Sequence, residues 1–283
     1  MSHRKNPEKA TDLHGTRFIS NAGIQTAYHE AGQGRPCVLI HGFTGSKLDF
    51  HDELDRLEDL GRVIAYDLRG HGESSNLGPY IFSTLVTDLI GFLDQIDVQQ
   101  CDLLGHSLGG MVAIRAVLQH PHRFRSLILM DTAAEPLEDT AENSRELINS
   151  VVLEQGCGAL LKMMRAQPAS PAVRRGIDHL GEAEHWRRIR VKLSQMDRQA
   201  FVELSAELRS YAALTDQLAG IACPTTVIVG QRDVPFIASS KSLATEIPDA
   251  RLVSIPLAGH CPQYENADAW RDAVRAHLTG ART

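Results

Sequence analysis

The chain has 283 residues, of which 43% are hydrophobic, 23% charged and 5% aromatic, and its formal net charge is −6 at pH 7. This is the composition of an ordinary globular protein, long enough for one large domain or for a core with an insertion. The acidic balance argues against a nucleic-acid binder, which normally carries a basic stripe. The longest apolar runs are too short to cross a bilayer.

The cysteines and the N-terminal segment bear on the cellular compartment. The five cysteines form no CxxC pair and leave one over, which is typical of free or buried thiols in a reducing compartment. Residues 1–15 are polar and lack the apolar stretch of a signal peptide. We therefore expect a cytoplasmic protein that associates with neither nucleic acid nor membrane. The sequence carries no signal for an oligomeric state.

Strand and helix patterns alternate along the first half of the chain. Residues 16–21 and 24–29 flank an Ala-Gly pair and predict a short hairpin. Apolar spacing then predicts, in chain order, strand 37–41, helix 48–60, strand 63–67, helix 81–96, strand 101–104, helix 108–119 and strand 127–131.

The middle of the chain has a different character. Between about residue 136 and residue 211 no strand pattern appears, and helical patterns cover 147–153, 159–164 and 182–208. Two strands, 225–229 and 251–255, and a closing helix at 267–278 follow.

Continuous apolar strands that alternate with helices predict an α/β fold with a mostly parallel sheet, buried on both faces under helices. We predict a core domain made of residues 1–133 and 214–283. Residues 134–213 are expected to form a helical cap, inserted where a strand ends and a substrate wall is commonly built.

The segment 103–110, LLGHSLGG, places Ser107 between two glycines, after an apolar run and before a helical pattern. G-x-S-x-G at a strand-to-helix junction is typical of a nucleophile elbow, a tight turn that exposes the serine hydroxyl. Larger side chains at positions 105 and 109 would collide with neighbouring backbone in so sharp a turn. The helix N-terminus beside the serine favours developing negative charge. The sequence therefore predicts that Ser107 is a nucleophile.

A serine nucleophile needs a base, and the base needs an orienting acid. His260 follows the last predicted strand, in a loop at its carboxyl end. Two aspartates follow strands after the serine: Asp233 after residues 225–229, and Asp131 at the end of 127–131. We favour Asp233, because its strand is next to the one that leads to His260, and Asp131 is the competing candidate. Both choices keep the order serine, acid, histidine that accompanies a nucleophile elbow.

Several segments together resemble the α/β-hydrolase fold family. They are HGFTGS at 41–46, DLRGHGES at 67–74, GHSLGG at 105–110, and the pair GQRD at 230–233 with AGH at 258–260. The resemblance extends over nearly the whole chain apart from the insertion. It implies a catalytic triad made of Ser107, Asp233 and His260.

The same resemblance implies that HGFTGS supplies part of an oxyanion hole. The backbone N–H groups of Phe43 and Leu108 would be the two donors, which stabilise the oxyanion formed when a carbonyl is attacked. A phosphate-binding loop is the alternative interpretation of this segment. It fails, because such a loop needs Gly-Lys-Ser/Thr together and here Ser46 separates Gly45 from Lys47.

Other polar residues near these motifs are expected to be structural. The resemblance implies that Asp67, Arg69 and His71 belong to a turn whose charges bond neighbouring backbone. His106 is expected to pack or bond locally, and nothing places Cys261 for nucleophilic work.

A serine at position 107 counts against family members that dehalogenate or open epoxides, because those attack with a carboxylate. We expect a serine hydrolase that cleaves a small carboxylic ester or lactone through an acyl-enzyme on Ser107. His260 would act as general base and acid, and Asp233 would orient it. We expect neither a metal nor an organic cofactor, because the sequence has no HExxH motif or other ligand cluster.

Three alternatives stay open. Carbon–carbon bond hydrolases of ring-fission dienoates use the same triad, but often resemble GNSMGG and HGxGPG where this chain has GHSLGG and HGFTGS. The menaquinone-pathway synthase that eliminates pyruvate resembles HGFTGS well, but would have an arginine where Met111 stands. A small-molecule receptor with weak or no turnover is the third alternative.

The insertion carries a basic run and scattered apolar residues. The basic residues would either hold an anionic substrate or form a solvated helix face paired with Glu182 and Glu184, and we favour the second; they are Arg174, Arg175, Arg187, Arg188, Arg190 and Lys192. Five apolar residues are candidates for the pocket wall, although helical spacing also fits simple packing: Leu153, Leu160, Met163, Met164 and Trp186.

Overall fold

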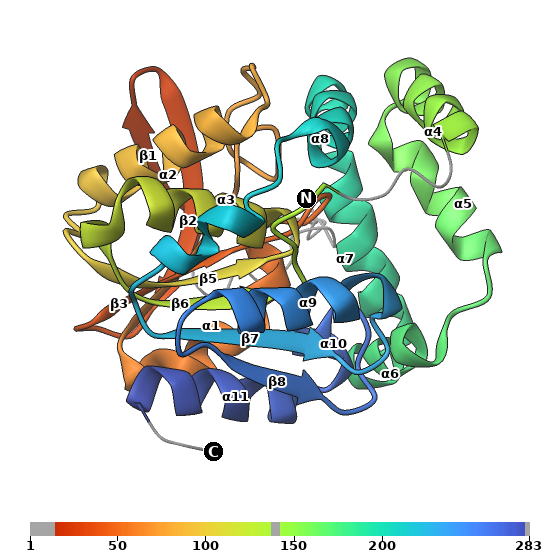
Figure 1. The fold of residues 1–283 in the computed structure, drawn as a ribbon. Coiled ribbons are helices and arrows are strands. Elements are labelled where there is room, and N and C mark those ends of the chain that lie inside the picture. Colours follow the sequence, from red (N-terminus) through yellow and green to blue (C-terminus); the bar gives the residue numbers. More distant parts are fainter. Residues whose placement is uncertain (1–14, 137–141, 281–283) are drawn as a thin grey trace, which may run out of the picture.

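A twisted sheet runs through the centre of the structure, a computed structural model that describes residues 15–136 and 142–280 (Figure 1). Within these residues eight strands pair in the order β1-β2-β4-β3-β5-β6-β7-β8. They are β1 (Arg17–Asn21), β2 (Ile24–Ala31), β3 (Pro36–Ile40), β4 (Arg62–Tyr66), β5 (Cys101–His106), β6 (Phe124–Met130), β7 (Thr225–Gly230) and β8 (Arg251–Ile255). The pairs of β1 with β2 and of β2 with β4 are antiparallel, and the others are parallel. The predicted α/β fold with a mostly parallel sheet is confirmed.

Burial along the strands follows their position in the sheet. The inner strands β3, β4, β5 and β7 are almost entirely buried, as expected of parallel strands covered on both faces. The expectation of burial on both faces is wrong for β8, where Leu252 is 41% exposed. This strand forms an edge of the sheet, where the covering layers end.

Helices cover both faces of the sheet. The helices α2 (Phe82–Gln95), α3 (Leu108–Gln119) and α9 (Val234–Glu246) contribute buried residues to one large apolar cluster. The helices α1 (His51–Leu57) and α11 (Ala267–Thr279) contribute to a second cluster on the opposite face. The helix predicted at 48–60 is divided into η1 (Lys47–Phe50), α1 and η2 (Glu58–Leu60), whereas α9 and the short α10 (Pro262–Glu265) were not predicted.

The insertion between β6 and β7 is helical, as predicted, and its helices lie together at the right of Figure 1. They are α4 (Glu142–Gln155), η4 (Cys157–Ala159), α5 (Leu160–Ala166), α6 (Pro171–Leu180), α7 (Glu182–Ser194) and α8 (Arg198–Ser210). These helices share a small buried cluster of their own, and α8 also buries three residues in the main core. Part of the expected cap, 137–141, lies outside the described residues, as do residues 1–14, on which the signal-peptide argument rests.

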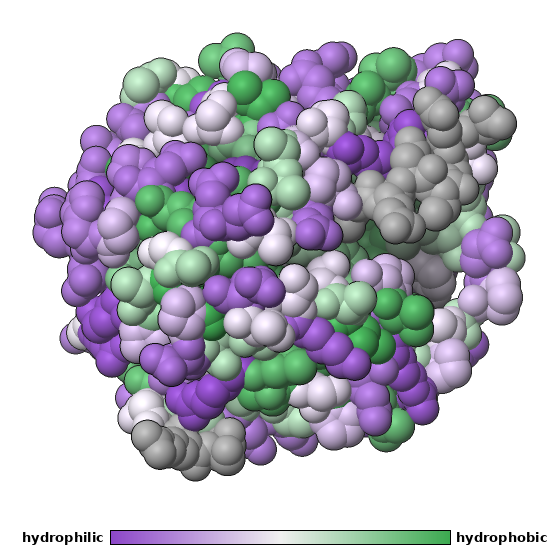
Figure 2. Space-filling model, viewed as in Figure 1, coloured by the Kyte–Doolittle hydropathy of each residue, from purple (hydrophilic) through white to green (hydrophobic). Residues whose placement is uncertain are grey.

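None of the helices in the described ranges is long and apolar enough to span a bilayer. The face shown in Figure 2 is a mixture of hydrophilic and hydrophobic residues, with the hydrophobic ones in small separated groups.

Helix α3 lies very close to β5 because glycines occupy the junction between them. A Cβ at Gly109 would lie 2.5 Å from the carbonyl oxygen of Ile40, and a Cβ at Gly105 would collide with the backbone of Gly109. Between these glycines Ser107 has φ 52° and ψ −116°. This left-handed backbone is rarely adopted by residues with a side chain. The tight, strained turn that the sequence predicts is therefore present.

The segment after β4 is a structural turn, as expected. The Asp67 carboxylate accepts hydrogen bonds from the backbone N–H and the Nζ of Lys47 (2.6 and 2.8 Å) and from the N–H of Glu73 (2.9 Å). Arg69 pairs with Asp88 of α2. The partners therefore include side chains from neighbouring elements as well as local backbone.

Two buried histidines connect this turn to the loop after β3. The rings of His71 and His41 lie 4.9 Å apart between centroids. His41 Nε2 accepts a hydrogen bond from the N–H of Leu68 (3.0 Å). Burial lowers the pKa of His71 to about 3 and the pKa of His41 to about 4. Both rings are therefore neutral near neutral pH, and acid must charge them against the low polarity of the interior.

Replacing Gly109 with alanine is expected to lower the free energy of unfolding by about 3 kcal/mol, because the added Cβ meets backbone that cannot rotate away. Gly158→Ala is the matched control, since an added Cβ there has no neighbour within 4 Å. Its effect should stay within about 0.5 kcal/mol. Urea unfolding of both variants measures the difference, and equal midpoints would contradict this account of the turn.

Replacing His71 with asparagine should make stability less dependent on pH. The unfolded chain takes up this proton near the ordinary pKa of 6.5, but the folded chain only near about 3. Between these values the unfolded state binds more protons, so the free energy of unfolding falls as the pH falls. The variant should flatten this dependence by about 1.4 kcal/mol per pH unit between about pH 6 and pH 4. Urea unfolding at several pH values tests the prediction, and an unchanged slope would refute it.

Candidate active site

Ser107 lies at the carboxyl end of β5 and immediately before α3. Its N–H donates to the carbonyl of Met130 (2.9 Å), and its own carbonyl accepts from the Thr132 hydroxyl (2.7 Å). Both bonds involve only its backbone and hold the strained turn in place. Within the described ranges the Ser107 hydroxyl, which is half-buried, makes no hydrogen bond, including to His260.

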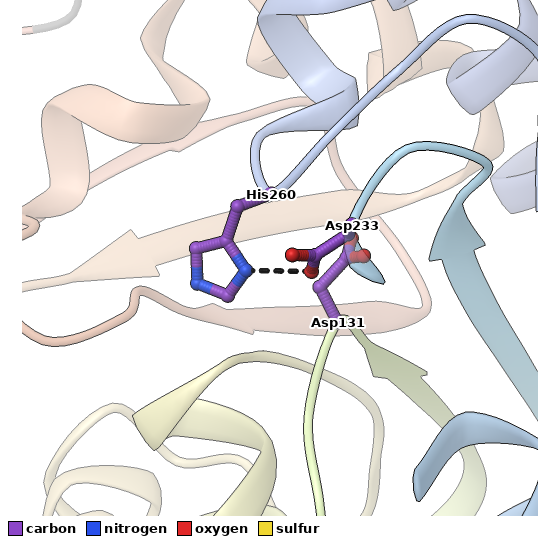
Figure 3. Close-up of side chains that lie close together, drawn as sticks. All are labelled: Asp131, Asp233 and His260. Carbon is purple, nitrogen blue, oxygen red and sulfur yellow. Dashed lines mark hydrogen bonds and ion pairs between the residues drawn. The ribbon is translucent and has the colours of Figure 1, made fainter. Parts of the chain in front are cut away.

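The predicted base and acid are in direct contact. His260 follows β8 and Asp233 follows β7, two neighbouring parallel strands. Nδ1 of His260 lies 2.8 Å from Oδ2 of the buried Asp233 (Figure 3). The ring of Phe236 stacks on the imidazole with centroids 4.9 Å apart, which fixes its plane. Nδ1 is therefore occupied by a carboxylate, which leaves Nε2 as the nitrogen for proton transfer.

Asp131, the competing acid, lies beside Asp233 and does not bond the imidazole (Figure 3). One ligand atom from each of Asp131, Asp233 and His260 lies within 4.8 Å of the others. Oδ1 of Asp131 accepts a hydrogen bond from the N–H of Gly230 (2.8 Å). Burial, and after it the charge of Asp233, raises the pKa of Asp131 well above its ordinary value. The geometry favours Asp233 as the partner of the histidine.

His106 joins the elbow to the loop that carries His260. Its Nε2–H donates to the carbonyl of His260 (2.7 Å), and the two rings lie 4.9 Å apart. Burial lowers the pKa of His106 to about 3, so the ring is neutral at neutral pH. His106 is expected to pack or bond locally; it does pack against a neighbouring ring, but its hydrogen bond goes to a segment 154 positions later in the chain.

The loop after β3 lies against the elbow. A Cβ at Gly42 would lie 3.1 Å from the Cβ of Ser107. Leu108 is the first residue of α3, where N–H groups lack partners within the helix. In the part of the chain that the structure describes, neither the N–H of Phe43 nor that of Leu108 donates to a protein acceptor. Phe43 borders the cavity described below, whereas Leu108 is fully buried and, like Ser107, is not among the residues that line it.

A cavity of about 560 Å³ lies between these loops and the insertion, and it is bordered by Gly42, Phe43, His106 and His260. Its far wall is mainly apolar and includes Met164, Val173, Leu180, Trp186, Ile189 and Leu193. Of the predicted pocket candidates, Met164 and Trp186 border the cavity, whereas Leu153, Leu160 and Met163 do not. A second cavity of about 470 Å³ lies at the opposite edge of the sheet, at the amino ends of the strands.

The basic residues of α7 that border the cavity are paired with carboxylates. Nε of Arg188 donates to Glu184 (2.7 Å), and its two terminal nitrogens donate to Asp52 (2.5 and 3.0 Å). Nζ of Lys192 donates to the buried Asp49 (2.5 Å). The predicted pairing with Glu184 is confirmed. The expectation of a wholly solvated helix face is wrong, because Asp52 and Asp49 belong to the core domain.

Glu265 is a site residue that sequence reasoning missed. Its buried carboxylate accepts hydrogen bonds from the N–H groups of Gly259 (2.5 Å) and Cys261 (3.4 Å), on either side of His260. It therefore holds the loop that carries the histidine. The only signal was a glutamate a few residues after the predicted base, and that spacing is too common to be informative.

The chain is similar in sequence and in structure to several known proteins. The model of the alpha/beta hydrolase family matches residues 37–273. A 3-oxoadipate enol-lactonase 2 from Acinetobacter baylyi is 30% identical over 271 residues, covering 93% of this chain and 97% of that protein. A 2-hydroxymuconate semialdehyde hydrolase from Pseudomonas putida is 30% identical over 94% of each chain. A thermophilic esterase from Thermogutta terrifontis has a TM-score of 0.82 at 28% identity, over 95% of this chain and 100% of its own. Because the family model spans most of its length, the chain belongs to the alpha/beta hydrolase family.

Proposed function

We propose that the chain is a serine hydrolase that cleaves a small, uncharged carboxylic ester or lactone through an acyl-enzyme on Ser107. The observation that carries this proposal is the 2.8 Å contact between Nδ1 of His260 and the Asp233 carboxylate, in a chain whose Ser107 stands on a strained elbow at the same edge of the sheet. An imidazole oriented through Nδ1 by a buried carboxylate is the activating arrangement that a serine nucleophile needs.

The proposed cycle uses the groups already described. His260 Nε2 takes the proton of Ser107 as the hydroxyl attacks the carbonyl carbon, and returns it to the leaving oxygen. The amides of Phe43 and Leu108 stabilise the oxyanion, a contribution of several kcal/mol in related chemistry. Water, activated by the same histidine, then releases the acid and restores the serine. The insertion acts as a cap that excludes bulk water from the cavity.

The charge balance of the cavity favours an uncharged substrate. All three guanidinium nitrogens of Arg188 are engaged by carboxylates, and Lys192 is matched by Asp49. Arg188 and Lys192 are the arginine and the lysine that border the cavity, among the residues that the structure describes. A substrate carboxylate would lose its hydration on entering this mainly apolar space, and no free cation would replace the lost water. Binding a charged substrate therefore costs free energy.

Carbon–carbon cleavage of a ring-fission dienoate is the second candidate, and the similarity to a semialdehyde hydrolase favours it. Such a dienoate is a carboxylate, so this reaction requires a cation that is free to meet it. The paired state of Arg188 and Lys192 therefore weighs toward the ester or lactone. The pyruvate-eliminating synthase reaction also uses carboxylate substrates and is disfavoured on the same ground.

Replacing Ser107 with alanine should abolish hydrolysis of p-nitrophenyl butyrate, with a fall in kcat of at least about 1,000-fold, because no acyl-enzyme can form. Ser150→Ala, on the exposed face of α4, is the matched control and should hydrolyse the ester at the wild-type rate. Release of p-nitrophenol measures both. Substantial activity in the Ser107 variant, or no turnover of any ester by the wild type, would overturn the proposal.

The substrate class is tested with two esters that differ only in a terminal charge: p-nitrophenyl hexanoate and mono-p-nitrophenyl adipate. We expect kcat/KM to favour the uncharged ester by roughly 100-fold, because the carboxylate is desolvated without a free cation. Combining Asp52→Asn with Glu184→Gln frees Arg188 and should narrow this ratio.

Glu146→Gln, at an exposed position on α4, is the control for that double variant and should leave the ratio unchanged. Wild-type preference for the adipate ester would show that Arg188 or Lys192 binds substrate carboxylates despite their partners. That result would restore the dienoate reaction as the better candidate.

A further inference from the structure

Asp131 lies next to the proposed triad but takes no part in the proposed catalytic cycle. It follows β6 and is fully buried, with an exposed fraction of 0%. Its backbone has φ 46°, a left-handed conformation in which an aspartate or asparagine is tolerated better than most residues. Oδ1 is satisfied by the N–H of Gly230 (2.8 Å). The second carboxylate oxygen of Asp131, Oδ2, is also buried and needs a hydrogen-bond partner of its own.

Oδ2 of Asp131 meets no N–H or O–H donor in the described part of the chain. A carboxylate oxygen of Asp131 lies within 4.8 Å of a carboxylate oxygen of Asp233. Two carboxylates, both ionised and buried side by side, would repel strongly at low effective dielectric. A proton on one of them converts that repulsion into a hydrogen bond.

The surroundings indicate which carboxyl holds the proton. Asp233 Oδ2 is already the acceptor for His260 Nδ1, and a hydrogen bond to an ionised carboxylate is stronger than one to a neutral carboxyl. The carboxyl groups that face Asp131 are Asp233, after β7, and Glu265 of α10, with His260 beyond Asp233. Burial and both carboxylates raise the pKa of Asp131. The neutral form therefore belongs on Asp131.

The same three side chains could also be interpreted as ligands of a metal ion. Two ligand atoms about 2.0 Å from one zinc ion at a tetrahedral angle lie about 3.3 Å apart. Nδ1 of His260 and Oδ2 of Asp233 are 2.8 Å apart, which is the distance of a direct hydrogen bond. The contact between His260 and Asp233 therefore has the geometry of a hydrogen bond and not that of two ligands of one ion.

We propose that Asp131 keeps its proton at neutral pH and donates a hydrogen bond from Oδ2 to the Asp233 carboxylate, as a positioning residue for the triad. This inference rests on the proposed function to the extent that Asp233 orients His260. The proton stays on Asp131 throughout the cycle, so no bond forms or breaks there. The pair carries one negative charge, and the donated hydrogen bond holds the Asp233 carboxylate in the orientation that faces the imidazole.

The protonation state is tested without any substrate, by ¹³C NMR of the protein labelled at its aspartate carboxyl carbons. We expect a resonance of a protonated carboxyl at neutral pH that disappears in Asp131→Asn. Asp102→Asn is the matched control, because Arg35 and Arg125 hold that buried carboxylate ionised and its pKa lies below the ordinary value. It should remove a resonance of an ionised carboxylate. Loss of an ionised resonance in Asp131→Asn would overturn the proposal.

The positioning role is tested by the pH–rate profile of ester hydrolysis. Asp131→Gly removes the donor without straining a left-handed backbone. Asp233 then carries its full charge and stabilises the imidazolium more strongly, so the acidic limb of kcat/KM should move to higher pH by about one unit. Asp131→Asn restores both a donor to Asp233 and an acceptor for Gly230, and should return the limb to its wild-type position.

Two other results of the pH–rate measurement would contradict the proposal. If the acidic limb of kcat/KM in Asp131→Gly stays at its wild-type pH, Asp131 only fills space. A limb displaced to lower pH in Asp131→Asn would mean that an ionised Asp131 contributes charge to the imidazolium. If no ester is hydrolysed at all, the proposed function fails, while the NMR result still decides the protonation of Asp131.

Discussion

Four neighbouring parallel strands, β5 to β8, end at the same edge of the sheet, and the proposed site depends on this alignment. Ser107, Asp131, Asp233 and His260 each follow one of these strands, in the spatial order of the strands. Register between parallel strands is fixed by hydrogen bonding along their whole length. Residues far apart in the chain are therefore brought to one edge of the sheet by buried backbone that has little freedom to move, and two of them, Asp233 and His260, lie at hydrogen-bond distance.

Charge is distributed unevenly between the two sides of the site. On the side of the core, carboxyl groups gather around His260, and one of them orients the imidazole directly. On the side of the insertion, Arg188 and Lys192 border the cavity, but each is matched by carboxylates of the core. These pairs also tie α7 to the core. The same contacts that join the insertion to the core thus neutralise the positive charge of α7 at the cavity, and this links the position of the insertion to the proposed class of substrate.

The parts that could be predicted from the sequence are those encoded locally. Ser107 is predicted as a nucleophile because two glycines flank it, and the structure shows that backbone contacts within the turn require both glycines. His260 is predicted as the base because a loop at a strand end carries it. The reach of His106 to the His260 carbonyl, and of Arg188 to Asp52, could not be predicted, since the partners lie 154 and 136 positions apart. The sequence favours Asp233 over Asp131 because the strand before Asp233 is next to the one that leads to His260, and in the structure Asp233 contacts the imidazole. The position of Asp131 beside that pair could not be predicted, because it depends on the distance between two strand ends.

The most direct test of the account is a crystal structure of the protein after reaction with a p-nitrophenyl alkylphosphonate, which mimics the tetrahedral intermediate. The account predicts phosphorus bound to Ser107 Oγ, the phosphoryl oxygen within hydrogen-bond distance of the amides of Phe43 and Leu108, and the alkyl chain in the apolar cavity. Phosphorus on another residue, or a phosphoryl oxygen directed away from both amides, would contradict it.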